Sequence, residues 1–338
     1  MNKNSRRLGV YTIIISAITI AAIVLRTIAL YNDFDYGTGY FDNSLMITIA
    51  SIVMASGFLL TLILSLTLDK VSLRATFDSP HTYVPLGVLG VSTLALFFYL
   101  FREADVFSII GGEADIEKLL SLASAVFAII AIIHLFMTTF YTASQVKTRA
   151  YFATGAIIFY ALFATAIYFD SSSAMNAHVK VTDQMAVLFA AVFMLFEARI
   201  SLGREKWRGY MGSGLIALAI TSYAAIPNLI IYFARATTLS DSIEVTVFLV
   251  AFSFFAISRL VLTMRLGEAG EAKSITTMRE YAEARETEIR NGETKQDEDD
   301  MQITIDDLFG EEIEDESEND KVADETTETE ESKENEEE

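Results

Sequence analysis

Eight apolar stretches, each long enough to cross a lipid bilayer, occupy most of the chain up to residue 266. An α-helix needs about 20 mostly apolar residues to cross roughly 30 Å of hydrocarbon. Within hydrocarbon every backbone N–H and C=O must be paired inside the protein, so such stretches form helices. The stretches lie at residues 8–30, 45–68, 83–101, 119–141, 150–169, 185–202, 210–234 and 243–266.

This pattern predicts an all-α fold, a polytopic membrane helical bundle in which about eight transmembrane helices form four hairpins over residues 1–266. Lys3, Arg6 and Arg7 precede the first stretch, as basic residues do in a secretory signal. The apolar run from Leu8 to Leu25 is longer than the apolar region of such a signal, and no small-residue cleavage site follows. We therefore expect the first helix to remain as a signal anchor.

The net charge of −20 is concentrated after the last apolar stretch. Residues 267–338 contain 29 Asp and Glu but 7 Lys and Arg, a net charge of −22, whereas residues 1–266 carry +2. A nucleic acid partner requires a basic face, so this composition argues against one. The partners that we expect are the lipid bilayer and a cytosolic protein.

The acidic region divides into two segments. Residues 267–292 are expected to form a juxtamembrane segment with a short helix over 275–290, capped by Ser274 and ended by Asn291 and Gly292. Residues 293–338 have the composition of a disordered acidic tail. An apolar patch at 302–314 interrupts this tail and predicts a docking peptide, although an apolar cluster without a partner is the alternative. The docking residues would be Ile303, Ile305, Leu308 and Phe309.

Basic and acidic residues alternate between successive loops, and this alternation predicts the orientation. Lys and Arg are retained on the cytoplasmic side during insertion. We therefore expect a multi-pass protein of the cytoplasmic membrane with both termini in the cytoplasm. The cytoplasmic series is Lys3, Arg6, Arg7, Lys70, Arg74, Lys147, Arg149, Arg204, Lys206, Arg208, Arg265 and Lys273. The outward loops would contain Asp33, Asp35, Asp42, Glu103, Asp105, Glu113, Asp115, Glu117, Asp170, Asp183 and Asp241.

Tyrosines lie near both ends of the predicted spans. Amphipathic aromatic rings prefer the level of the lipid headgroups, so these residues are interpreted as interface anchors. The outer set is Tyr31, Tyr99, Tyr168 and Tyr232, and the cytoplasmic set is Tyr11, Tyr83, Tyr151 and Tyr210.

Charged residues inside the spans are the first candidates for a site, because charges in hydrocarbon are costly and usually face the protein interior. Arg26 either extends its side chain to the outer interface or binds an anionic group. Glu197 and Arg259 lie at matching depths and are predicted to form an ion pair. A gating or coupling carboxylate is the alternative for Glu197.

Three further polar residues lie within spans. His134 is expected to hydrogen-bond to a neighbouring helix, and the alternative of a catalytic pair with Ser213 competes with close helix packing at the glycines around Ser213. Pro227 removes a backbone donor and predicts a kink. The carbonyl that it frees could line a cavity together with the Asn228 amide.

The sequence provides no recognisable metal, cofactor or catalytic site. The chain has no cysteine, and its three histidines, His81, His134 and His178, are far apart without metal-ligand spacing. The acidic loop at 32–42 departs from the calcium-binding pattern, because a glycine and the distal glutamate are missing from their required places.

These observations leave two function hypotheses from different classes. The preferred one is a non-catalytic membrane scaffold that recruits a cytosolic protein through its tail. The alternative is a small-solute transporter or channel that uses the helix core. A transporter predicts a water-filled cavity lined by Glu197, Arg259 or Asn228, whereas a scaffold predicts a packed core.

Overall fold

The computed structural model describes residues 3–36, 38–68, 83–112, 115–139, 146–171, 174, 176–201, 207–235 and 242–263. The predicted short helix over 275–290 and the docking patch with Ile303, Ile305, Leu308 and Phe309 lie outside these described residues. The helices within them are α1 (Lys3–Asn32), α2 (Leu45–Leu66), α3 (Tyr83–Glu103), α4 (Val106–Ile110), α5 (Ile116–Thr139), α6 (Val146–Phe169), α7 (His178–Ser201) and α8 (Trp207–Arg235). A last helix covers Ile243–Thr263.

The predicted fold class is confirmed. Eight of the described helices are long and apolar enough to span a membrane, namely all except the short α4. Over the described residues, extended structure is limited to one isolated antiparallel bridge between Phe34 and Phe41. These helices indicate a multi-pass protein in a lipid bilayer, because a helix pairs its backbone groups internally.

One predicted boundary is wrong. The sixth span begins at His178 and not near residue 185, so Asp183 lies inside α7 and is buried instead of belonging to an outward loop. Lys180 and Thr182 are likewise buried in this first part of α7. Polar residues end a span when they face lipid, but these are buried in the protein, where Lys180 donates to the Asp170 carbonyl and Thr182 to the His178 carbonyl.

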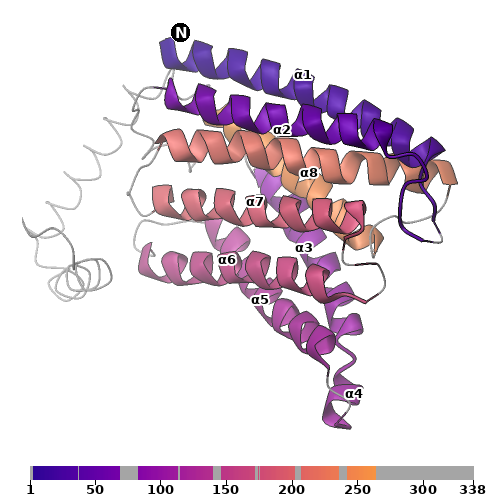
Figure 1. Cartoon of the computed structure of the whole chain (residues 1–338). Coiled ribbons are helices and arrows are strands. Elements are labelled where there is room, and N and C mark those ends of the chain that lie inside the picture. The colour runs from indigo at the N-terminus through magenta and orange to yellow at the C-terminus, as the bar shows by residue number, and fades with distance from the viewer. Residues whose placement is uncertain are drawn as a thin grey trace, which may run out of the picture. The chain divides into compact units, whose positions relative to one another are not determined.

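Successive spans pack against each other as hairpins, and α8 lies at the centre of one side (Figure 1). Helix α1 packs on α2, α3 on α5, and α6 on α7, while α8 also contacts α1, α2 and α7. The Ile243–Thr263 helix pairs with α8 through the Thr221 and Ser253 hydroxyls, 2.8 Å apart. In the most apolar 18 residues of each span, 78% of α8 and 67% of Ile243–Thr263 are buried, against 28% of α2. These two helices therefore form the interior.

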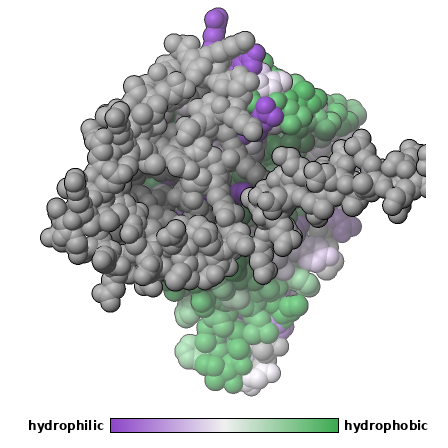
Figure 2. Space-filling model, turned by 90° about the vertical axis from the view of Figure 1, so that its left-hand side faces the viewer, coloured by the Kyte–Doolittle hydropathy of each residue, from purple (hydrophilic) through white to green (hydrophobic). Residues whose placement is uncertain are grey.

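The outer surface of the described helices is apolar. Ile13, Leu59 and Val91 are each more than 60% exposed although they lie in the middle of spans. Figure 2 shows this apolar character in the described part of the face that it presents. Such a surface is stable when lipid covers it.

Candidate functional site: two buried polar clusters

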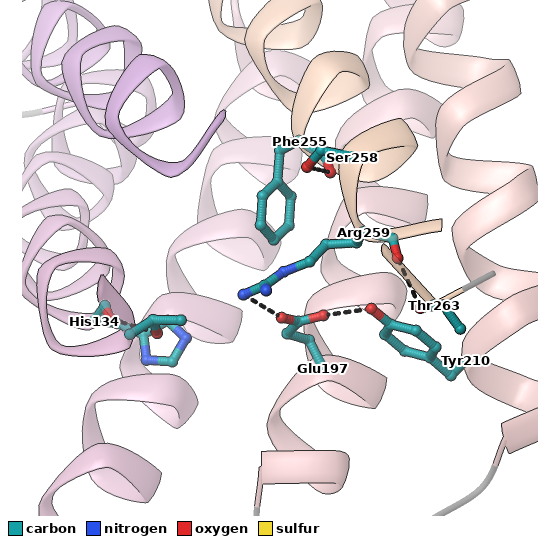
Figure 3. A network of polar contacts seen from close by, with 8 residues as sticks. His134, Glu197, Tyr210, Phe255, Ser258, Arg259 and Thr263 are labelled. Atoms are coloured by element: carbon teal, nitrogen blue, oxygen red, sulfur yellow. Dashed lines mark hydrogen bonds and ion pairs between the residues drawn. The ribbon is translucent and has the colours of Figure 1, made fainter. Parts of the chain in front are cut away.

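The first cluster, called the Glu197 cluster, consists of Glu197, Tyr210, Arg259 and Thr263, near the end of the bundle where α1 begins. Arg259 Nη2 lies 2.9 Å from Glu197 Oε1, and both side chains are at most 3% exposed. The Tyr210 hydroxyl donates to Glu197 Oε2 at 2.9 Å (Figure 3). Thr263 donates to the Arg259 carbonyl and lies beside the Tyr210 hydroxyl. The predicted ion pair between Glu197 and Arg259 is therefore present.

Both carboxylate oxygens of Glu197 are engaged, and the ion pair has no net charge. The Arg259 guanidinium also lies 5.3 Å from the centre of the Phe255 ring, where the ring quadrupole favours a cation. Removing one partner from such a buried pair would leave an uncompensated charge. In this conformation the carboxylate is enclosed and joins α7, α8 and the Ile243–Thr263 helix.

Tyr210 corrects one of the sequence predictions. It was expected to anchor the span at the headgroup level, but it is 1% exposed and stacks on Phe193 of α7, with ring centres 5.1 Å apart. Its position near the start of α8 is compatible with either role. Only the direction in which it faces, which depends on helix packing, decides between them.

His134 and Ser213 have different surroundings. His134 lies in α5 and is buried, and its carbonyl accepts the Thr138 hydroxyl at 2.8 Å (Figure 3). Ser213 donates to the Tyr210 carbonyl of its own helix at 3.0 Å. A Cβ on Gly214 would lie 2.9 Å from Phe193 and 3.0 Å from Leu260. The glycines around Ser213 therefore serve close helix packing.

The second cluster, called the Arg26 cluster, consists of Arg26, Asp183, Tyr223, Pro227 and Asn228, toward the opposite end of the bundle. Arg26 of α1 is fully buried and donates from Nη1 to the Tyr223 carbonyl of α8 at 2.8 Å. Its guanidinium lies 4.7 Å from the centre of the Tyr223 ring. The expectation that Arg26 extends to the outer interface is therefore wrong.

Pro227 explains why Arg26 bonds to this carbonyl. In an α-helix the C=O of Tyr223 would accept the N–H of the residue four positions later, but that residue is Pro227, which has no N–H. Arg26 supplies the missing donor from a different helix. Helix α8 continues through Pro227 to Arg235, and Asn228 is 2% exposed.

Asp183 brings a negative charge to the Arg26 cluster. It is 3% exposed and lies in the first part of α7, toward the same end of the bundle as Arg26. Sequence reasoning missed this residue because it was placed in a loop. The signal that could have found it is helical spacing, because Asp183, Val187, Ala190 and Glu197 share one buried face of α7.

The Arg26 cluster leaves hydrogen-bonding groups unused. Arg26 Nε and Nη2 and the Tyr223 hydroxyl are among the buried side-chain atoms of the described residues that have no hydrogen-bond partner, and so is Glu197 Oε1 of the other cluster, which is held by the ion pair alone. Buried polar groups in proteins are nearly always paired with protein, water or ligand. The Arg26 guanidinium thus uses only part of its hydrogen-bonding capacity in this conformation.

A hollow of about 380 Å³ lies at the same end of the bundle, between α2 and α7. His178 lines it and lies 3.2 Å from the Ser51 hydroxyl through Nε2. His178 begins α7 and Arg26 lies near the end of α1, so the hollow and the Arg26 cluster lie toward the same end of the bundle. The other residues that line the hollow are Ile47, Thr48, Ile52 and Ala55.

Neither a metal cluster nor a known relative assigns these clusters a role. The described part of the chain contains no group of three or more His, Asp or Glu side chains that could hold a metal ion. Comparison with protein-family models, curated proteins and solved structures finds no match. The function must therefore be argued from the two clusters and from the distribution of charge.

Proposed function

We propose that the protein is a non-catalytic component of the cytoplasmic membrane that recruits a cytosolic protein through residues 267–338. The observation that supports this proposal is the enclosure of the groups that a solute path would need. Glu197, Arg259 and Asn228 are at most 2% exposed. The bundle then serves as the membrane anchor, and the acidic region that follows it carries the interaction.

In the proposed orientation, the chain enters and leaves the helical bundle on the cytoplasmic side, so both termini lie in the cytoplasm. Eight spans return the chain to the side on which it starts, and basic residues predominate in the loops of that side. Cysteine labelling in intact cells tests this on the naturally cysteine-free chain. Thr38→Cys should react with an impermeant reagent, whereas Ser144→Cys should not. Reaction at both positions, or the reverse pattern, would contradict the orientation.

The proposed docking segment is 302–314. Leu308 and Phe309 are adjacent large apolar residues in a region that is otherwise acidic. Short apolar clusters in such regions fold on a partner, and acidic flanks steer them toward a basic groove. Binding should therefore weaken with added salt and require both apolar side chains.

Affinity capture from a cell lysate tests recruitment. The full-length protein is compared with a chain that ends at residue 272 and with a Leu308→Ala/Phe309→Ala variant, which keeps every acidic residue. The proposal predicts a specific bound protein that both altered chains lose. A partner retained by the double variant would show that charge alone acts, and identical capture by all three chains would remove the proposal.

Transport of a small solute remains the alternative proposal, and one observation favours it. Charged residues lie in the interior of the bundle, including the incompletely paired Arg26. A path through the bundle would require the Glu197–Arg259 ion pair to separate. Glu197→Gln would then change solute uptake by vesicles that contain the protein, while a scaffold role predicts unchanged capture of the cytosolic partner and no uptake.

A further inference from the structure

Helix α4 is not one of the eight spans, yet it carries the most exposed large apolar side chains of the described part of the chain. Phe107 is 88% exposed and Ile110 is 78% exposed. The two residues are three positions apart, so they share one face of the helix. Figure 1 shows α4 at the tip of the hairpin that α3 and α5 form. An exposed apolar face of this kind indicates an interaction surface.

The turns on both sides of α4 and one hydrogen bond fix the direction of this face. Asp105, directly before α4, has a φ of 40°, and Gly112 after it has a φ of 90°. A non-glycine residue rarely adopts a positive φ, and this conformation persists only where the surrounding structure holds it. Lys118 of α5 donates from Nζ to the Ser108 hydroxyl at 2.8 Å. The polar side of α4 is thus tied to α5, and the apolar face points away.

The length of α3 places α4 at the level of the lipid headgroups. Helix α3 has 21 residues, so it is about 32 Å long, close to the roughly 30 Å of the hydrocarbon layer. Two residues separate its end from the start of α4. Near that end, the Arg102 guanidinium lies 5.5 Å from the centre of the Tyr99 ring, and such amphipathic side chains are typical of the membrane interface.

The apolar surface continues from the two spans to α4. Phe98 and Phe101 are exposed in the last turns of α3, and Ile116 and Leu119 are exposed in the first turn of α5. Lipid covers these side chains because they lie on helices that span the membrane. Phe107 and Ile110 extend the same surface, so the phospholipid layer is the neighbour that this face fits.

We propose that α4 is an interfacial anchor whose Phe107 and Ile110 side chains insert into the phospholipid leaflet at this end of the bundle. Interfacial apolar faces are buried about 5–10 Å into the boundary between headgroups and acyl chains. Arg102 forms an exposed ion pair with Glu103 at 3.2 Å, so the attraction is apolar and requires no anionic headgroup. The anchor sets the depth of the α3–α5 hairpin, and it depends neither on recruitment nor on transport.

Tryptophan fluorescence in reconstituted vesicles tests the depth of α4. The chain contains one tryptophan, Trp207, so Phe107→Trp is introduced into a full-length Trp207→Phe background. The protein is reconstituted into phosphatidylcholine vesicles whose acyl chains carry bromine either near the glycerol end or near the chain end. Iodide is added on both sides of the bilayer. The proposal predicts blue-shifted emission, strong quenching by the shallow bromines, weaker quenching by the deep bromines and little quenching by iodide.

Two further variants control this measurement in the same background. Ile110→Trp lies on the same face of α4 and should give the same pattern, which provides an independent reading. Phe98→Trp lies deeper on α3 and should be quenched relatively more by the deep bromines. Quenching of the α4 positions by iodide alone would place them in water and overturn the proposal. Protection from both iodide and bromine would mean that a protein surface covers α4, and it would also overturn the proposal.

Discussion

The two buried clusters use the same types of residue with different results. Each combines a carboxylate from α7, a tyrosine from α8 and an arginine from a third helix. In the Glu197 cluster, arginine and tyrosine both bond to the carboxylate. In the Arg26 cluster, arginine donates to a backbone carbonyl and the tyrosine hydroxyl is unpaired. The first cluster is built around an ion pair between side chains, whereas the second is built around a backbone carbonyl.

Pro227 accounts for much of this difference. It removes the donor that would normally pair with the Tyr223 carbonyl, so a strong acceptor remains inside the bundle. Arg26 satisfies this acceptor and is thereby held against α8. A proline within a buried helix can therefore position a charged side chain from a different helix.

The largest expected effect comes from separating the Glu197–Arg259 ion pair. Glu197→Gln and Arg259→Met should each lower the free energy of unfolding by about 3–5 kcal/mol, because each leaves a buried charge uncompensated. The double variant should lose less than the sum of the two. Equilibrium unfolding in detergent measures the cycle, and additivity within about 0.5 kcal/mol would show that the side chains do not interact.

A smaller loss of stability is expected from a substitution that disturbs the close helix packing beside Glu197 and Arg259. Gly214→Ala should cost about 1–3 kcal/mol, because its Cβ would press on Phe193 and Leu260, which neighbour the cluster. Gly90→Ala in α3 is the control, since nothing lies within 4 Å of its Cβ. Helix propensity predicts that this control is neutral or gains up to about 1 kcal/mol. Equal losses would contradict the packing explanation.

The smallest of the three effects is the coupling between Arg26 and Pro227. Pro227→Ala restores a backbone N–H for the Tyr223 carbonyl, so Arg26 is no longer its only donor. The destabilisation caused by Arg26→Met should therefore be smaller in the Pro227→Ala background, by about 1 kcal/mol. The same unfolding measurement on the four proteins tests this. An unchanged cost would mean that Arg26 does not compensate for the proline.

The fold could be predicted from the sequence because hydropathy alone identifies spans in a membrane. The Glu197–Arg259 pair could also be predicted, since opposite charges at matching depths have few other partners. The predicted start of α7 was wrong because charged residues such as Asp183 and Lys180 resemble loop residues in the sequence. Only the packing of the neighbouring helices shows that they are buried within the span. Burial inside the bundle depends on which face of α7 meets the other helices.

The Arg26 interaction could not be predicted for a different reason. Its partner is a backbone carbonyl 197 positions away in the sequence, and main-chain acceptors carry no residue-type signal. Pro227 and Arg26 were each noticed, but sequence alone could not place α1 against α8. Tyr210 was misassigned in the same way, because proximity to a helix end does not show whether a ring faces lipid or protein.

The most direct test of the contrast between the clusters compares the two tyrosine hydroxyls. Tyr210→Phe removes a hydrogen bond to a buried carboxylate and should cost about 1.5–3 kcal/mol. Tyr223→Phe removes an unpaired hydroxyl and should change the free energy of unfolding by less than about 0.5 kcal/mol. Equal costs for the two substitutions would contradict the conclusion that the Tyr210 hydroxyl is paired with a buried carboxylate and the Tyr223 hydroxyl is not.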